Sequence, residues 1–354
     1  MSIYYFANQV YQLSFAIPLF KKLGGIFIIK KPRKILSFKS RMINTNVDFQ
    51  QKTFLNIPPV IKKSPSQMQD LQGIVVSQSN TFLNVDRKKC KTIFVGHGTG
   101  DKRYGGKADT LLTYDYIFLS GDKHLQKIKD DKVDIPSEKL VKIGNTRFDD
   151  YVNNKINRER ELKRLGIVDK RLPNVLYAPT WRWGNGTFKK YVYKFARALT
   201  KDFNLIIRPH HHDSKRIHQV KLWAMSKGLK NIYFSNPNNL RTSDTINDFI
   251  VSDLMISDTS SIVYEYLITR KPIILIKNDC NILHNMPTEM DVSKYVPSYD
   301  GTQNLVSLIK QSLNDRNNFE TMNKLLYNCF YFNDGYSADR AANFIKKISQ
   351  QNDS

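Results

Sequence analysis

The fold class is indicated most clearly by residues 254–269, which read LMISDTSSIVYEYLIT. An apolar run at 254–257 is followed at once by carboxylate and hydroxyl side chains, and then by a helix-compatible run at 262–269. A buried strand that leads directly into a helix is typical of a parallel sheet with crossover helices. We therefore expect an α/β protein with polar residues at the carboxyl ends of its strands.

Similar apolar runs alternate with polar, helix-compatible stretches along the rest of the chain. We predict strands at 73–76, 92–95, 116–119, 140–143, 175–178, 205–208, 232–234, 254–257 and 272–276. A charged, helix-like segment at 153–170 separates two sets of strands, and 354 residues fit two domains better than one core. The sequence thus predicts two doubly wound domains, residues 1–155 and 156–354, which bind ligands across a central cleft.

The chain is strongly basic, with 55 Lys and Arg against 32 Asp and Glu and a net charge of +23. Residues 1–100 contain 15 basic and 3 acidic side chains. We expect no nucleic-acid partner, because no recognition motif is visible and charge alone gives only salt-sensitive, sequence-blind affinity. An anionic membrane is the other candidate, since aromatic residues are dense at 2–20 and cations follow at 21–41. The competing interpretation is a core helix followed by a strand at 25–30.

The compartment is indicated by apolar run lengths and cysteine spacing. No apolar run approaches the roughly 20 residues that a membrane-spanning helix needs, and the N-terminus lacks the pattern of a secretory signal. Cys90, Cys280 and Cys329 are widely spaced without a CxxC pair, which predicts reduced thiols and neither a disulfide framework nor a zinc ribbon. We expect a cytoplasmic protein.

A glycine-rich loop at 96–100 follows one predicted strand and contains His97. A histidine at a strand end is exposed to the cleft, and its usual pKa of about 6.5 suits proton transfer near neutrality. The glycine spacing matches neither the dinucleotide fingerprint nor the P-loop. The alternative is a tight turn with an incidental histidine.

A second candidate site is formed by residues 258–261, which precede a predicted helix. Hydroxyl groups beside the free N–H groups of a helix N-terminus can bind phosphate. Simple N-capping by Thr259 or Ser260 is an alternative, and the two interpretations are compatible.

Two further strand ends carry basic and aromatic residues. Arg208 is followed by histidines at 210–212, which we expect to point in different directions, so we predict no metal site and one histidine in the cleft beside Arg208. Arg182 can bind a diphosphate bidentately, and Trp181 can pack on a base or fill core. Spacing and periodicity predict a phosphate-binding α/β protein and nothing more specific.

Read together, these segments resemble the CDP-glycerol glycerophosphotransferase family, the teichoic acid primases and polymerases. The shared motifs are His97-Gly98-Thr99 with a nearby lysine, Gly-x-x-Arg-x-Asp at 144–149, YAPTWR at 177–182, Arg-x-His at 208–210, residues 247–253 followed by Asp-x-Ser-Ser at 258–261, and Asp334-Gly335 followed by Ala338 and Arg340. The likeness covers about residues 90–345, and no family motif lies in residues 1–89.

The resemblance implies a GT-B-like fold, with the acceptor in the first domain and the nucleotide donor in the second. It implies a transferase that moves glycerol phosphate, or a similar polyol phosphate, from a CDP-linked donor to an acceptor hydroxyl in teichoic-acid-like or capsular polymer synthesis. CMP is released, and no cofactor or metal is implied. The implied catalytic residues are His97, as general base, and His210. The implied substrate-binding residues are Thr99, Lys102, Arg147, Arg182, Arg208, Asp258, Thr259, Ser260, Ser261 and Glu265.

The implied partners are the CDP-linked donor, a lipid-linked or polymer acceptor, and the inner face of the cell membrane, where the protein would be peripheral. A GT-B glycosyltransferase of surface polysaccharide synthesis is the alternative, because residues 257–261 and Glu265 can serve UDP-sugar phosphates equally well. The donor polyol, the acceptor, the choice between primase and polymerase, and the oligomeric state stay open.

Overall fold

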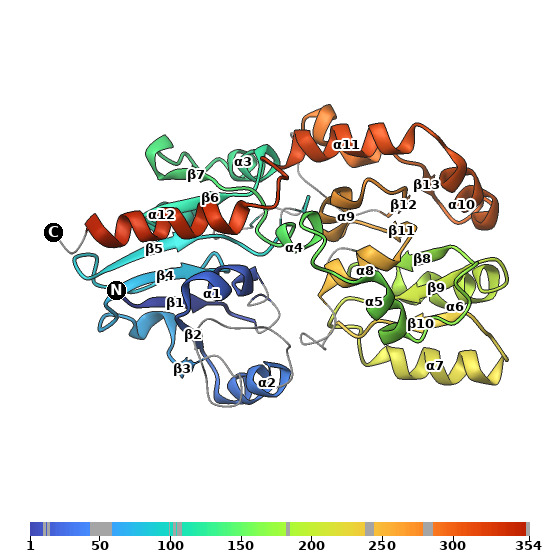
Figure 1. The fold of residues 1–354 in the computed structure, drawn as a ribbon, viewed down its shortest axis with the longest axis horizontal. Helices are drawn as coiled ribbons and strands as arrows, with labels where there is room; N and C mark the ends of the chain where they lie inside the picture. The colour runs from blue at the N-terminus through green and yellow to red at the C-terminus, as the bar shows by residue number, and fades with distance from the viewer. Residues whose placement is uncertain are drawn as a thin grey trace.

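The computed structural model describes residues 1–9, 12, 15–42, 59–98, 100–101, 104, 108–181, 185–237, 244–278 and 286–351, which form two α/β domains side by side (Figure 1). The strands of the first domain are β1 (Ile3–Phe6), β2 (Ile26–Ile29), β3 (Val60–Lys62), β4 (Gly73–Ser77), β5 (Cys90–Phe94), β6 (Tyr116–Leu119) and β7 (Leu140–Lys142). Its helices are α1 (Ile17–Leu23), α2 (Pro32–Met42), α3 (Asp122–Asp130) and α12 (Ser337–Gln351).

The second domain has a similar set of elements. Its strands are β8 (Asn174–Tyr177), β9 (Asn204–Ile207), β10 (Ile232–Phe234), β11 (Leu254–Ser257), β12 (Ile273–Ile276) and β13 (Ser298–Tyr299). Its helices are α5 (Arg158–Leu165), α6 (Phe188–Leu199), α7 (Arg216–Ser226), α8 (Thr245–Val251), α9 (Ile262–Tyr266), α10 (Leu305–Asn314) and α11 (Asn318–Cys329). The short helix α4 (Asp149–Val152) lies between the domains in sequence.

Both sheets are parallel and doubly wound. The strand orders are β3-β2-β1-β4-β5-β6-β7 and β10-β9-β8-β11-β12-β13, so the winding reverses between β1 and β4 and between β8 and β11. This confirms the predicted fold class, and every predicted strand is present with ends within two residues of those expected. The sequence prediction omitted β1, β3 and β13.

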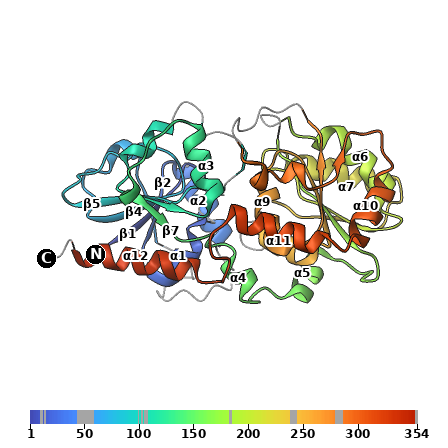
Figure 2. The same ribbon diagram turned by 90° about the horizontal axis from the view of Figure 1, so that it is seen from above.

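Alternate side chains of the first sheet pack on its two faces. Tyr5 and Phe27 join a core with residues of α1, α2 and α12, whereas Phe6 and Ile28 join a core with α3 on the other face. Figure 2 shows α12 and α3 on opposite sides of this sheet. The two-residue period of a strand buried on both faces explains why these runs are continuously apolar.

The described residues of the N-terminal segment form a helix and strands of the core, as one of the two interpretations of the sequence required. Tyr5, Phe6 and Phe20 are all buried, β1 pairs with both β2 and β4, and α1 and β2 are the helix and strand that this interpretation required. The buried side chains of Tyr5, Phe6 and Phe20 are therefore not available for contact with a membrane. Among the described residues, no helix is long and apolar enough to cross one.

The C-terminal helix α12 belongs to the first domain and not, as predicted, to the second. The sequence predicts that residues 156–354 form the second domain, but Ala341, Ile345 and Ile348 of α12 pack in the first domain's core against α1. The chain thus passes between the domains twice, at α4, where Tyr151 and Val152 already pack on the second domain's core, and after α11. The two passages are in contact, because Asn153 Nδ2 donates to the Gly335 carbonyl oxygen at 2.8 Å.

Candidate active site

The carboxyl ends of the two sheets meet at the domain interface. The loop after β5 packs directly on the residues that precede α9 in the second domain. A β-carbon at Gly100 would lie 2.8 Å from Ser261 Cα, and one at Gly98, where φ is +121°, would lie 3.3 Å from Ser261 Oγ. Glycine is required at position 100, because a larger side chain there would clash with the backbone of Ser261 and push the two domains apart.

His97 lies in this loop with a defined tautomer. Its Nδ1 is 2.6 Å from the carbonyl oxygen of Gln78, which can only accept a hydrogen bond, so Nδ1 carries the proton and Nε2 is the basic nitrogen. The Gln12 amide nitrogen lies 3.0 Å from Nε2 and 3.3 Å from Nδ1. Burial lowers the pKa of His97 to about 4, which keeps the ring neutral at pH 7. The ring is therefore neutral, and its Nε2 lone pair faces the Gln12 amide nitrogen in this structure.

Gln12 and Gln78 are site residues that the sequence interpretation missed. Gln12 follows β1 and Gln78 follows β4, so both lie where the winding of the first sheet reverses. Gln12 Oε1 also accepts from Ser79 Oγ at 2.8 Å, which fixes the amide beside the histidine. The rule that ligands bind beyond strand ends at such a point would have located both residues once β1 was recognised.

Arg147 and Glu265, two predicted substrate-binding residues, pair with each other across the interface. Arg147 Nη1 donates to Glu265 Oε2 at 2.6 Å, and its Nη2 donates to Asp244 Oδ1. The guanidinium also lies 4.3 Å from the centre of the Phe15 ring. Burial raises the pKa of Glu265, whereas the Arg147 charge, acting against burial, lowers that of Asp244. This ion pair joins the domains.

Asp258 supports a loop. Its Oδ1 accepts from the Thr180 backbone N–H at 2.7 Å, and its Oδ2 accepts from the Thr187 N–H at 3.0 Å and hydroxyl at 2.9 Å. Asp258 is 3% exposed and thereby holds both ends of the loop that carries Trp181. The geometry assigns it a positioning role, and direct contact with substrate stays a prediction.

Arg208 is held in a second buried network. Its Nη1 donates to Asp248 Oδ2 at 2.7 Å and to Ser235 Oγ at 2.9 Å, and Asp248 also accepts from Arg164 at 2.8 Å. These contacts tie β9 to α5 and α8. The network gives Arg208 a structural function, while contact with a ligand stays a prediction.

The three successive histidines converge, contrary to the expectation from sequence. One ligand nitrogen from each of His210, His211 and His212 lies within 4.8 Å of the other two, because a turn at 210–213 brings the rings to one side. Trp181 stacks on His210 with ring centres 5.5 Å apart and planes 7° apart. The argument that neighbouring histidines must diverge holds for an extended strand and is wrong for this turn.

The other predicted substrate-binding residues lie either before α9 or outside the part of the chain that the structure describes. The N-cap position of α9 is Ser261, without a side-chain capping hydrogen bond, so the capping predicted for Thr259 or Ser260 is not observed. All three hydroxyl residues, Thr259, Ser260 and Ser261, are half-buried beside the interface. Thr99, Lys102 and Arg182 lie outside the residues that the structure describes.

Comparison with known proteins identifies the family. A sequence model of the CDP-glycerol:poly(glycerophosphate) glycerophosphotransferases matches residues 15–347. The chain belongs to this family. The teichoic acid poly(glycerol phosphate) polymerase of Bacillus spizizenii (strain W23) is 30% identical over 138 residues, which are 35% of this chain and 32% of that protein. The match to this glycerophosphotransferase relative thus spans about a third of the relative's length.

Solved structures of similar fold include the wall teichoic acid polymerase TagF. One TagF structure, from a soak with CDPG, has a TM-score of 0.67 and 18% identity and covers 100% of this chain and 89% of its own. A UDP-GlcNAc 2-epimerase from Neisseria meningitidis, bound to UDP-GlcNAc, has a TM-score of 0.58 and 13% identity and covers 98% and 99%. The chain therefore has a GT-B-like fold.

Proposed function

We propose that this chain transfers a glycerol-phosphate, or similar polyol-phosphate, unit from a CDP-linked donor to an acceptor hydroxyl and releases CMP. The setting is the synthesis of a teichoic-acid-like or capsular polymer. Family membership supports this proposal, and the observation that carries it is the state of His97. His97 is neutral and its Nδ1–H donates to the Gln78 carbonyl oxygen. It lies in a loop that packs on Ser261 of the other domain.

The reaction is a displacement at phosphorus. The acceptor oxygen attacks the β-phosphorus of the donor, its proton passes to His97 Nε2, and the bond from the β-phosphorus to the oxygen of CMP breaks. One phosphodiester forms and CMP leaves. The negative charge of a bound diphosphate raises the pKa of a nearby histidine, so donor binding makes His97 a stronger base than it is in the empty cleft.

The second domain supplies the donor side in this proposal. Ser261 faces the His97 loop. In this scheme Ser261, Ser260, Thr259, His210 and Arg182 hold the diphosphate and stabilise charge on the leaving CMP. Asp258 keeps the loop of Trp181 in place through the hydrogen bonds to Thr180 and Thr187. The scheme assigns no step to a metal ion or a cofactor.

The test is a comparison of His97→Ala with His218→Ala, a control at an exposed histidine on α7. CMP release from CDP-glycerol in the presence of acceptor should fall by about 10²- to 10⁴-fold in His97→Ala and stay unchanged in the control. A native rate in His97→Ala would exclude this residue as the base.

Donor specificity is tested separately by thermal unfolding with CDP-glycerol, CDP, CMP and UDP-sugars. A ligand at about 100 times its Kd adds roughly 2.7 kcal/mol to the stability of the folded state, which raises Tm measurably. We expect stabilisation by the cytidine diphosphates. Selective stabilisation by UDP-sugars would instead support the glycosyltransferase alternative.

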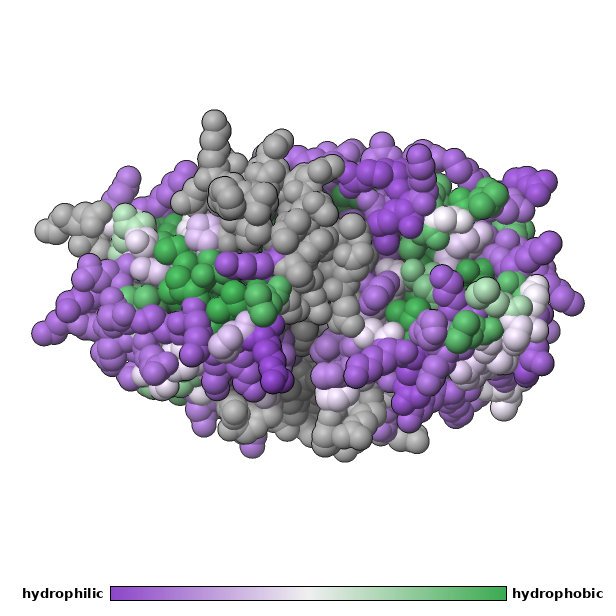
Figure 3. Space-filling model, turned by 90° about the horizontal axis from the view of Figure 1, so that it is seen from below, coloured by the Kyte–Doolittle hydropathy of each residue, from purple (hydrophilic) through white to green (hydrophobic). Residues whose placement is uncertain are grey.

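We also propose that the protein binds peripherally to an anionic membrane, where a lipid-linked acceptor would lie. The face that carries α2 and α7 is hydrophilic over much of its outline, with hydrophobic residues gathered within each half (Figure 3). Lys30, Lys31, Arg33 and Lys39 are exposed in and before α2, and Leu36 is 71% exposed among them. Each such cation contributes about 1 kcal/mol near an anionic surface.

Leu36→Asp should weaken vesicle binding without affecting turnover of a soluble acceptor, and unchanged binding would contradict the proposal.

A further inference from the structure

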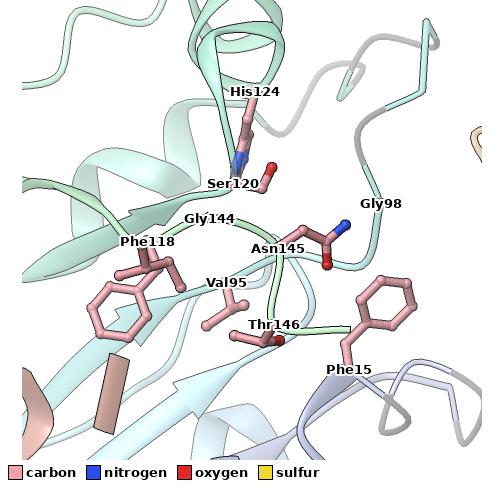
Figure 4. Close-up of a pocket in the computed structure, with 10 residues that line it drawn as sticks. Phe15, Val95, Gly98, Phe118, Ser120, His124, Gly144, Asn145 and Thr146 are labelled. Carbon is pink, nitrogen blue, oxygen red and sulfur yellow. The ribbon is translucent and has the colours of Figure 1, made fainter. Parts of the chain in front are cut away.

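A recess opens in the first domain at the carboxyl ends of β5, β6 and β7 (Figure 4). It contains about 410 Å³ of empty space, part of which is open to solvent. Val95 and Gly98 follow β5, Ser120 follows β6 and Asn145 follows β7, while Phe15 closes one side. The recess therefore lies at the sheet edge where doubly wound domains bind their ligands.

Two buried polar atoms in this recess lack hydrogen-bond partners. Ser120 Oγ and His124 Nδ1 are each shielded from solvent, and neither has a partner among the residues that the structure describes. In Figure 4 the His124 ring points toward Ser120. The other ring nitrogen, Nε2, is 2.9 Å from the Tyr104 hydroxyl, so the ring orientation is fixed. Unpaired buried polar atoms are costly, so a ligand hydroxyl or an ordered water is expected to pair with these two atoms.

The lining of the recess selects an uncharged, hydroxyl-bearing ligand. Among the described residues that line it, none carries a carboxylate, an ammonium or a guanidinium group. Apolar walls of Phe15, Val95 and Phe118 suit carbon atoms, and the Ser120, His124 and Asn145 side chains can exchange hydrogen bonds with hydroxyls. This mixture of apolar walls and uncharged polar side chains suits the hydroxyl-bearing end of a polyol better than a phosphate.

We propose that this recess binds the uncharged polyol end of the acceptor chain and so positions its hydroxyl for attack. This inference rests on the proposed function. Gly98 lines the recess and directly follows His97, and a β-carbon at Gly98 would lie 3.3 Å from Ser261 Oγ in the second domain. A diol bound on Ser120 and His124 would thus lie next to the loop that carries His97, and this loop packs on Ser261 of the donor side.

The glycerol of the donor carries the same kind of diol as the end of the acceptor. Enzyme kinetics can show which of the two binds in the recess. The variant is Ser120→Ala, and the control is Ser312→Ala, which removes a buried hydroxyl in α10 that donates to the Leu308 carbonyl oxygen. The acceptors are a short glycerol phosphate oligomer with a free terminal diol and the same oligomer with one terminal hydroxyl methylated.

For Ser120→Ala we expect the KM for the diol acceptor to rise by about 3- to 10-fold, the effect of one lost hydrogen bond. The KM for CDP-glycerol and the CMP release without acceptor should be unchanged. The methylated acceptor should be a poor substrate for the native protein, and Ser120→Ala should discriminate less between the two acceptors. A purely structural role for Ser120 would alter both substrates alike.

Two results would overturn the inference. If Ser120→Ala raises the KM for CDP-glycerol and leaves the KM for the acceptor unchanged, the recess binds the donor's glycerol. If neither KM changes, the recess holds only water. If the native protein releases no CMP at all, the proposed function fails, and the recess is then tested by equilibrium dialysis of the oligomer. Val95→Met, which fills the recess, should abolish that binding, and an absence of binding to the native protein would refute the inference independently.

Discussion

His124 should make the stability of this protein depend on pH in a calculable way. The side chain is 2% exposed, and burial, together with the charge of Lys127, lowers its pKa to about 3. An unfolded chain has a histidine pKa of about 6.5. Between these values the unfolded state binds more protons than the folded state, so stability rises with pH across this window and is lost as pH falls through it.

The size of this loss of stability depends on how far the pH lies below the histidine pKa of the unfolded chain. At pH 5 the unfolded chain is about 1.5 pH units below the pKa of its free histidine, so protonation favours unfolding by about 2 kcal/mol relative to pH 7. His124→Phe removes this contribution. It also leaves the Tyr104 hydroxyl without its partner, but that loss is the same at both pH values.

The assay is urea unfolding at pH 7 and pH 5, followed by circular dichroism. The pH-dependent loss of unfolding free energy should be about 2 kcal/mol smaller in His124→Phe than in the native protein, while His218→Phe, at an exposed position, should match the native protein. An equal pH-dependent loss in His124→Phe and the native protein would refute the assignment of a buried neutral histidine.

Three further outcomes test the fold and the interface. Deletion of residues 1–23 removes β1 from the middle of its sheet, so circular dichroism should show an unfolded first domain, and a folded product with weakened vesicle binding would restore the membrane interpretation. Gly100→Val should abolish turnover and leave each domain folded, because its β-carbon would lie 2.8 Å from Ser261 Cα; native turnover would mean that the domains need not meet there. Arg147→Leu leaves the Glu265 carboxyl buried without its partner and should destabilise the protein by about 3–5 kcal/mol in urea unfolding. The double variant with Glu265→Leu should recover part of that loss, and no recovery would contradict the pairing.

The sheets could be predicted in large part because buried parallel strands are continuously apolar and polar residues follow them directly. This pattern located His97 and the residues at 258–261. It failed at β1, since residues 2–20 combine a strand, a connection and a helix start within one aromatic stretch, and both faces of β1 are buried. Periodicity cannot separate a doubly buried strand from a buried helix.

The contacts between distant residues could not be predicted from the pattern. Arg147 and Glu265 are 118 positions apart, and each is equally reasonable as a ligand contact or as an ion-pair partner until the domains are placed together. Gln12 is 85 positions from His97. Ser120 and Asn145 do follow predicted strands, so the same rule that selected His97 would have selected them if it had been applied to every strand end.

The contact between the two chain passages determines how the cleft can open. Asn153 and Gly335 are hydrogen bonded, so both covalent connections lie at one point, and any relative motion of the domains that keeps this bond must be a rotation about an axis through that point. During such a rotation each atom moves in proportion to its distance from the axis. The connection at Asn153 and Gly335 can therefore stay intact while Gly100 separates from Ser261, which allows substrates to enter without unfolding either sheet.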